Sequence, residues 1–128
     1  MERLDLEYLR PETARQYDFY LMPKLLLDHK AFNSVDYGAK LLYSIMLSRA
    51  SSSTTNVDVF TDEDERIYII YTIEQVMKDM RCAKATAVKM LKQLDDIGLI
   101  EKKEIEQKEQ GKSMVLDGYK INTIREVK

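Results

Sequence analysis

The feature that most constrains the fold is a pair of amphipathic helical patterns within residues 71–100. The first pattern spans residues 73–80 and the second ends at Gly98. The break between them, at residues 81–82, leaves room only for a tight turn. An alternating, strand-like pattern follows Gly98. Two helices joined by a short turn and followed by a strand are the arrangement of a winged helix-turn-helix, which is a DNA-binding unit.

The second helical pattern has one apolar and one polar face. The apolar face repeats at helical spacing and consists of Ala87, Leu91, Leu94 and Ile97. Residues 81–94 contain four Lys or Arg residues and no Asp or Glu. Because the whole chain has 20 basic and 22 acidic residues, this local positive charge does not follow from composition. Lys and Arg that neutralise phosphates supply the sequence-independent part of DNA affinity, so the pattern favours a DNA-binding face over an ordinary solvated one.

We expect the DNA contacts to come from this polar face and from a hairpin, or wing, near the C-terminus. Short polar side chains near a helix start suit base edges in the major groove. The candidates for the major groove are Lys84, Ala85, Thr86, Lys89 and Gln93. Arg81 and Lys92 are the candidates for phosphate contact, and Lys108 and Lys112 are those for backbone contact through the wing. If Lys89 reads a base, Lys89→Ala should weaken specific binding by about 1–3 kcal/mol.

The predicted fold class is α+β, a winged helix-turn-helix with a small antiparallel sheet. The pattern predicts a short strand at 18–22, a helix from 24 that ends before 33, and a helix with its N-cap at Ser34 or Asp36 that runs to about 49. It then predicts a polar loop at 50–58, an acidic turn at 61–65, a strand at 67–71, a strand at 99–106, a polar tip at 107–113 and a last strand at 114–122. The helix that runs to about residue 49 has an apolar stripe that we expect to face the core, formed by Tyr37, Leu41, Leu42, Ile45 and Met46. Lys40 is expected to face solvent.

A length of 128 residues fits one folded domain. We expect an N-terminal arm at 1–17, a winged-helix domain at 18–122 and a tail at 123–128. The apolar side chains of the arm suggest that it packs on a partner subunit or on its own domain. The single cysteine, Cys82, excludes a disulfide within the chain. That fits a cytoplasmic location. The sequence also shows no signal-peptide pattern, and its apolar runs are much shorter than the roughly 20 residues of a membrane helix, which fits the same location.

The sequence offers little for catalysis. It has no phosphate-binding loop of the Gly-x-x-x-x-Gly-Lys-Ser/Thr form and no His and Cys cluster for zinc. The acidic run at 62–65 lacks the ligand spacing of a calcium loop. A tyrosine nucleophile for strand nicking would need a pair of metal-binding histidines, and His29 is the only histidine. We therefore expect no enzyme activity, no cofactor and no metal.

Two segments resemble a known family. The first reads Phe-Tyr-Leu-Met-Pro-Lys-Leu-Leu at 19–26, followed by Tyr-Gly-Ala-Lys-Leu-Leu-Tyr at 37–43. The second starts with Glu-Arg-Ile-Tyr-Ile-Ile-Tyr-Thr-Ile-Glu at 65–74 and continues to Gly-Leu-Ile at 98–100. Together they resemble the N-terminal domain of RepA_N-type plasmid replication initiators of Gram-positive bacteria, over about residues 18–121. The Phe-Tyr-x-x-Pro-Lys and Gly-Ala-Lys-Leu-Leu-Tyr pieces are the more specific ones.

The resemblance implies a winged-helix domain that binds repeated double-stranded DNA sites at a plasmid or mobile-element origin, commonly as a homodimer. Host replication proteins are further partners of such an initiator. Initiators of this kind carry a C-terminal domain, which we expect to lie outside this chain. One departure concerns Ala83, where family members often place a capping residue. Alanine cannot accept a hydrogen bond from the free N–H groups of the helix start, which costs about 1 kcal/mol relative to a good cap.

Two alternatives remain at this point. A transcriptional repressor could use the same fold, because fold does not settle function. A protein-interaction module of a replication complex could use the same helix to bind a protein partner. The net charge of −2 and a pI of about 5.5 are compatible with either alternative, and with a site-specific DNA binder whose positive charge is local.

Overall fold

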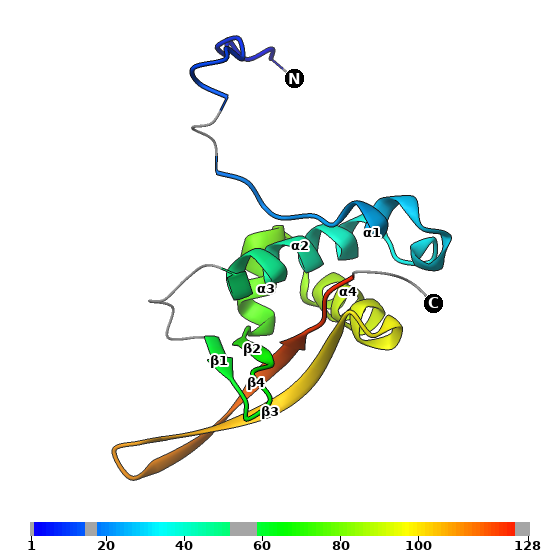
Figure 1. Cartoon of the computed structure of the whole chain (residues 1–128). Coiled ribbons are helices and arrows are strands. Elements are labelled where there is room, and N and C mark those ends of the chain that lie inside the picture. The colour runs from blue at the N-terminus through cyan, green and yellow to red at the C-terminus, as the bar shows by residue number, and fades with distance from the viewer. Residues whose placement is uncertain (1, 15–17, 52–58, 125–128) are drawn as a thin grey trace.

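The computed structural model describes residues 2–14, 18–51 and 59–124. Parts of the predicted arm, of the loop at 50–58 and of the tail lie outside the described residues. The elements in chain order are α1 (Lys24–Asp28), η1 (Lys30–Phe32), α2 (Tyr37–Ser51), β1 (Val59–Thr61), β2 (Ile67–Ile70), α3 (Ile73–Met80), α4 (Lys84–Ile97), β3 (Ile100–Glu109) and β4 (Lys112–Ile121). The α+β winged-helix prediction is therefore confirmed, and Figure 1 shows the helices gathered beside the sheet.

The four strands form one antiparallel sheet in the order β1-β2-β4-β3. β2 pairs with the second half of β4, so that Tyr68 faces Lys120 across the ladder and Ile70 faces Gly118. The other half of β4 pairs only with β3. As a result the β3–β4 hairpin extends well beyond the other strands, and Figure 1 shows it as a long ribbon leaving the body of the domain. This hairpin is the wing.

The predicted polar tip at 107–113 is wrong in its extent. Only Gln110 and Gly111 form the turn, and both have positive φ, at 52° and 76°. This combination is that of a two-residue type I′ turn, whose twist matches the twist of the flanking strands. The ladder therefore continues to the pair Glu109 and Lys112. Polar composition suggested a hairpin tip that spans 107–113, but the two-residue turn extends both strands into that range instead.

The helix-turn-helix forms as the pattern predicts. Thr72 begins α3 with a capping box: its hydroxyl accepts the backbone N–H of Gln75, and the Gln75 amide oxygen accepts the backbone N–H of Thr72. α3 ends at Arg81, whose φ of 50° and ψ of 53° place it in the left-handed region. α4 then begins at Lys84. Gly98 ends α4 with a φ of 87°, a conformation that glycine adopts without steric cost.

The core lies between the helices and the inner face of the sheet. α4 packs against both α2 and α3, and α2 also packs against β2. The apolar face predicted for α4 is confirmed, because Ala87, Leu91 and Leu94 are buried and Ile97 is half-buried. The largest fully buried side chains are Tyr43, Tyr71, Leu26, Leu42, Met46, Ile69, Leu94 and Ile100. α4 is thus anchored on two helices through its buried face.

The predicted apolar stripe of α2 is wrong at its first turn. Tyr37 is 80% exposed and Leu41 is 43% exposed, whereas Lys40 is only 5% exposed. The helix is rotated so that Ala39 and Tyr43 face the core. The small Gly38 lies close to Met90 of α4, so this side of α2 faces the neighbouring helix while the larger Tyr37 is turned outwards. The expected roles of Tyr37 and Lys40 are therefore reversed.

Two strand assignments also change. Residues 18–22 form no strand; their backbone is held to α2 by the Leu21 N–H, which donates to Ser48 Oγ at 2.7 Å. The large apolar side chains of this run are exposed. Conversely, β1 was not predicted. It is a three-residue edge strand paired to β2, and so short a run carries little periodic signal.

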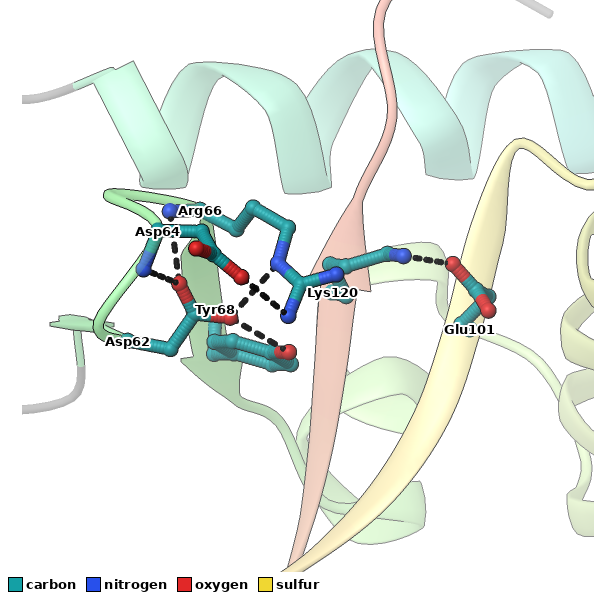
Figure 2. Close-up of polar contacts among 6 residues, drawn as sticks. All are labelled: Asp62, Asp64, Arg66, Tyr68, Glu101 and Lys120. Carbon is teal, nitrogen blue, oxygen red and sulfur yellow. Dashed lines mark hydrogen bonds and ion pairs between the residues drawn. The ribbon is translucent and has the colours of Figure 1, made fainter.

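A polar cluster holds the acidic turn between β1 and β2 (Figure 2). The Asp62 carboxylate accepts hydrogen bonds from the Arg66 Nε at 2.7 Å and the Tyr68 hydroxyl at 3.0 Å. It also accepts the backbone N–H groups of Arg66 and Asp64. Burial acts to raise the pKa of Asp62, but these hydrogen bonds outweigh it and lower the pKa to about 2. The predicted acidic turn is therefore confirmed as an ordered one.

The same side of the sheet carries a cross-strand ion pair between β3 and β4. Figure 2 shows Lys120 of β4 reaching the carboxylate of Glu101 on β3. The hydrogen bond from Lys120 is the main cause that lowers the pKa of Glu101. Lys120 is also the ladder partner of both Tyr68 and Glu101. The cluster and the pair together tie the β1–β2 turn and the root of the wing to one sheet.

Candidate nucleic-acid interface

The first turn of α4 projects its predicted contact residues into solvent. Lys84, Ala85 and Thr86 are all exposed, and so is Arg81 in the preceding turn. None of these four side chains has a hydrogen bond or ion pair among the described residues. The face predicted for DNA contact therefore exists at this end, with its cations available to a ligand.

The start of α4 also leaves backbone donors free. Ala83 occupies the cap position and makes no side-chain hydrogen bond. The first N–H to be satisfied within the helix is that of Ala87, which donates to the Ala83 carbonyl at 3.1 Å. The three preceding N–H groups lack a helical partner, and α4 has no acidic residue in its first turn. A helix start of this kind attracts negative charge through both its N–H groups and the helix dipole.

The later turns of α4 differ, because the predicted contact residues there have partners within the molecule. The Gln93 amide donates to Asp36 Oδ2 at 2.8 Å and its oxygen accepts the Asp36 backbone N–H at 2.9 Å. Lys89 Nζ lies 3.7 Å from the same Asp36 carboxylate. Gln93 is half-buried, whereas Lys89 remains exposed. Asp36 directly precedes α2, so Gln93 joins two helices and is not free to read a base in this arrangement.

Lys92 is paired along its own helix. Its Nζ lies 2.9 Å from Asp96 Oδ2, one helical turn later. The hydrogen bond that Lys92 donates to this carboxylate, together with the negative charge of Asp96, raises the pKa of the Lys92 ammonium. Both side chains are exposed, so a stronger anion can still compete for Lys92. Lys92, the candidate for phosphate contact, is thus exposed but has its charge partly offset by Asp96.

The wing does not bring its two predicted lysines to one surface. Lys108 lies opposite Ser113 and Lys112 lies opposite Glu109 in the β3–β4 ladder. Paired residues share a face of a hairpin and successive residues alternate, so Lys108 and Lys112 project from opposite faces. Both are exposed. One face of the wing can therefore present one of these lysines to a DNA backbone, not both.

The residues that sequence reasoning missed are the acids that hold the cations of α4. Asp96 follows Lys92 by four residues, a spacing from which an ion pair on a helix can be predicted. Asp36 lies 57 residues from Gln93, and no local pattern indicates that contact. It arises only because α2 packs against α4.

Within the described ranges, no group of three or more His, Cys, Asp or Glu side chains could hold a metal ion. Cys82, at the turn between α3 and α4, is half-buried and packs against the core as a small apolar side chain would. Across the same ranges, no helix is long and apolar enough to cross a membrane.

Comparison with known proteins gives one family and several similar folds. The family described as "Replication initiator protein A (RepA) N-terminus" matches residues 18–126. A solved structure described as "N-Terminal domain of DNA binding protein" has a TM-score of 0.68 and 23% identity, covering 93% of this chain and 85% of that one. Another, "Structure of Rep-DNA complex", has a TM-score of 0.67 and 22% identity, covering 95% and 88%.

A third solved structure, "Structure of MDR initiator", has a TM-score of 0.66 and 20% identity, covering 95% of this chain and 90% of that one. At these identities the likeness concerns the fold. A search of curated protein sequences finds no match. The family match spans the whole winged helix, including both segments on which the sequence resemblance rests.

Proposed function

This chain belongs to the family of replication initiator protein A N-terminal domains, and on that premise we propose that it binds double-stranded DNA. The proposed target is a set of repeated sites at the replication origin of a plasmid or mobile element. The proposed role is to initiate replication there by binding those sites. The domain acts as a binding module in the cytoplasm, without catalysis, cofactor or metal.

The observation that carries the proposal is the first turn of α4. Lys84 and Arg81 are exposed and without partners among the described residues, and the helix start beside them has free N–H groups. This turn belongs to the second helix of a helix-turn-helix, whose N-terminal residues contact base edges in the major groove. A protein structure described as a Rep-DNA complex has the same fold, which supports the proposal by similarity.

The contacts are proposed to divide by position. Lys84, Ala85 and Thr86 read bases, whereas Arg81 and Lys92 bind phosphates. Lys89 contacts the backbone in competition with Asp36, which lies within ion-pair distance of it. One lysine of the wing, Lys108 or Lys112, adds a backbone contact. These roles leave Gln93 as a residue that orients α4 against α2.

A homodimer is proposed to bind the repeats, through the N-terminal arm. Leu4, Leu6, Tyr8 and Leu9 are each at least 70% exposed, and Figure 1 shows this segment projecting away from the domain. So many exposed apolar side chains on one short segment are typical of a surface that a partner covers. Removal of residues 1–17 should convert the dimer to a monomer in sedimentation experiments. A dimer that survives the truncation would exclude this role of the arm. Host replication proteins are further proposed partners.

A salt titration tests the proposed function. Binding is measured to a duplex with the element's own origin repeats and to a scrambled duplex of equal composition. We expect a steep decrease of log K with log salt on both, because phosphate contacts release counterions, and tighter binding to the repeats. Preference for a single promoter palindrome would favour a repressor instead. Weak, salt-insensitive binding to every duplex would favour a protein-interaction module.

A further inference from the structure

Lys40, in the first turn of α2, is buried, with only 5% of its surface exposed. Lysine is rarely buried without a partner, because removing its charge from water is costly. Among the described residues Lys40 makes no side-chain hydrogen bond and no ion pair. Its ammonium lies 5.3 Å from the centroid of the Tyr37 ring, a cation–π contact. The packing therefore holds a cation that has no anion within ion-pair distance among the described residues.

This ammonium borders a surface cavity of about 590 Å³. The cavity is lined by Leu27, Asn33, Val35, Asp36, Tyr37 and Lys40. Asn33 and Tyr37 are exposed and carry an amide and a hydroxyl, groups that often donate to phosphate oxygens. The site thus combines a positive charge with neutral donors, which suits a phosphate group better than an uncharged ligand.

The start of α2 adds to the attraction for an anion. α2 has 15 residues and no acidic residue in its first turn. Its Lys40 N–H donates to the Asp36 carbonyl at 3.0 Å, so the three preceding N–H groups lie at the unsatisfied end of the helix. Asp36 is the one acid of the lining. Its carboxylate is engaged by the Gln93 amide and lies within ion-pair distance of Lys89.

The cavity adjoins the surface proposed to bind DNA. Asp36 lines the cavity and at the same time contacts Lys89 and Gln93 of α4. The start of α2 lies directly against α4, since a Cβ added at Gly38 would come within 3.2 Å of Met90 Sδ. A DNA strand that runs beside α4 would therefore pass the mouth of the cavity. We infer that the cavity at the start of α2 binds a backbone phosphate of the DNA through Lys40, which widens the interface beyond α4 and the wing.

This inference rests on the proposed DNA binding, and one experiment separates the two. Wild type and Lys40→Met are titrated with salt on the repeat duplex and on the scrambled duplex. Lys40→Met keeps the length of the side chain and removes its charge. Loss of one phosphate contact should flatten the slope of log K against log salt by about 0.9, on both duplexes alike. Lys24→Met is the matched control, because Lys24 is exposed on α1 and does not line the cavity.

A wild type that binds neither duplex would reject the proposed function and with it the inference. A wild type that binds, together with an unchanged slope for folded Lys40→Met, would overturn the inference alone. So would an equal flattening by Lys24→Met, because the effect would then reflect overall charge.

A second pair of variants decides the question if Lys40→Met fails to fold. Tyr37 is 80% exposed at the cavity, so substitutions there leave the core intact. Tyr37→Glu and Tyr37→Gln have nearly the same shape and differ in charge. A phosphate at this site requires that Tyr37→Glu bind both duplexes more weakly than Tyr37→Gln. Equal affinities of the two variants would overturn the inference.

Discussion

The first turn of α4 and its later turns carry similar polar residues but differ in the contacts that these residues make within the molecule. At the start of the helix, Lys84 and the residues beside it have no partner among the described side chains. In the later turns, Asp36 engages Lys89 and Gln93, and Asp96 engages Lys92. The difference teaches that a cationic helix face is not a uniform binding surface. The internal acids leave the first turn as the part most available to DNA.

The comparison depends on a rigid helix, and the substitution with the largest expected effect removes that rigidity. Leu94 of α4 is fully buried where the helix packs on the core. Leu94→Ala should lower the free energy of unfolding by about 2–5 kcal/mol, through lost burial and the cavity that remains. Chemical denaturation followed by circular dichroism measures the change. A loss well under 1 kcal/mol would mean that α4 is not anchored as described.

The next two substitutions compare the first turn of α4 with its later turns directly. Lys84→Ala should weaken binding to the origin repeats by about 1–3 kcal/mol, with a smaller effect on scrambled DNA, because it removes a base contact. Lys92→Ala should weaken both duplexes by similar amounts and flatten the salt slope by at most about 0.9, as for one phosphate. Fluorescence anisotropy titrations provide both affinities. A larger loss of specificity from Lys92→Ala than from Lys84→Ala would contradict this division between the first turn and the later turns of α4.

A further substitution removes the negative charge of Asp36 beside Lys89. Asp36→Asn keeps a side-chain oxygen for the Gln93 amide and removes the charge near Lys89. Lys89 should then interact more strongly with phosphates, and the salt slope should become steeper by up to about 0.9. The stability should change by less than about 1 kcal/mol, since exposed ion pairs contribute little. A slope that stays at the wild-type value would show that Asp36 does not restrain Lys89.

The smallest expected effect concerns the pKa of Lys92. Asp96 raises that pKa in the folded protein. A raised lysine pKa stabilises the fold at pH below the unfolded value, about 10.4, and this contribution is lost as the pH rises through the folded pKa. Asp96→Asn should shift the Lys92 pKa down towards its ordinary value. NMR titration of the lysine side chains detects the shift, and an unchanged pKa would remove Asp96 as the partner.

Local signals account for most of what the sequence predicted correctly. The structure confirms three features whose residues are close together in the sequence. They are the capping box of Thr72 and Gln75, the apolar face of α4 and the strand pattern of β2. The same holds for the helix-turn-helix as a whole. Such features depend on spacing along the chain, which a sequence displays directly.

The errors come from contacts between distant segments. The rotation of α2, which exposes Tyr37 and covers Lys40, depends on how closely α2 approaches α4. The engagement of Gln93 depends on Asp36, far away in the chain. A polar face can be predicted from periodicity, but which of its members remain available to a ligand depends on tertiary packing. The cation without a partner at Lys40 is invisible in the sequence for the same reason.

The most direct test of the central claim is photo-crosslinking from the two ends of α4 to the origin duplex. A photoreactive side chain replaces Ala85 in one variant and Asp96 in another, both exposed positions. The crosslinked bases are mapped on the repeats. The account predicts efficient crosslinks from position 85 to bases within each repeat and few from position 96. Base crosslinks from position 96 but not from position 85, in a complex that still forms, would contradict the claim that the first turn of α4 reads the DNA.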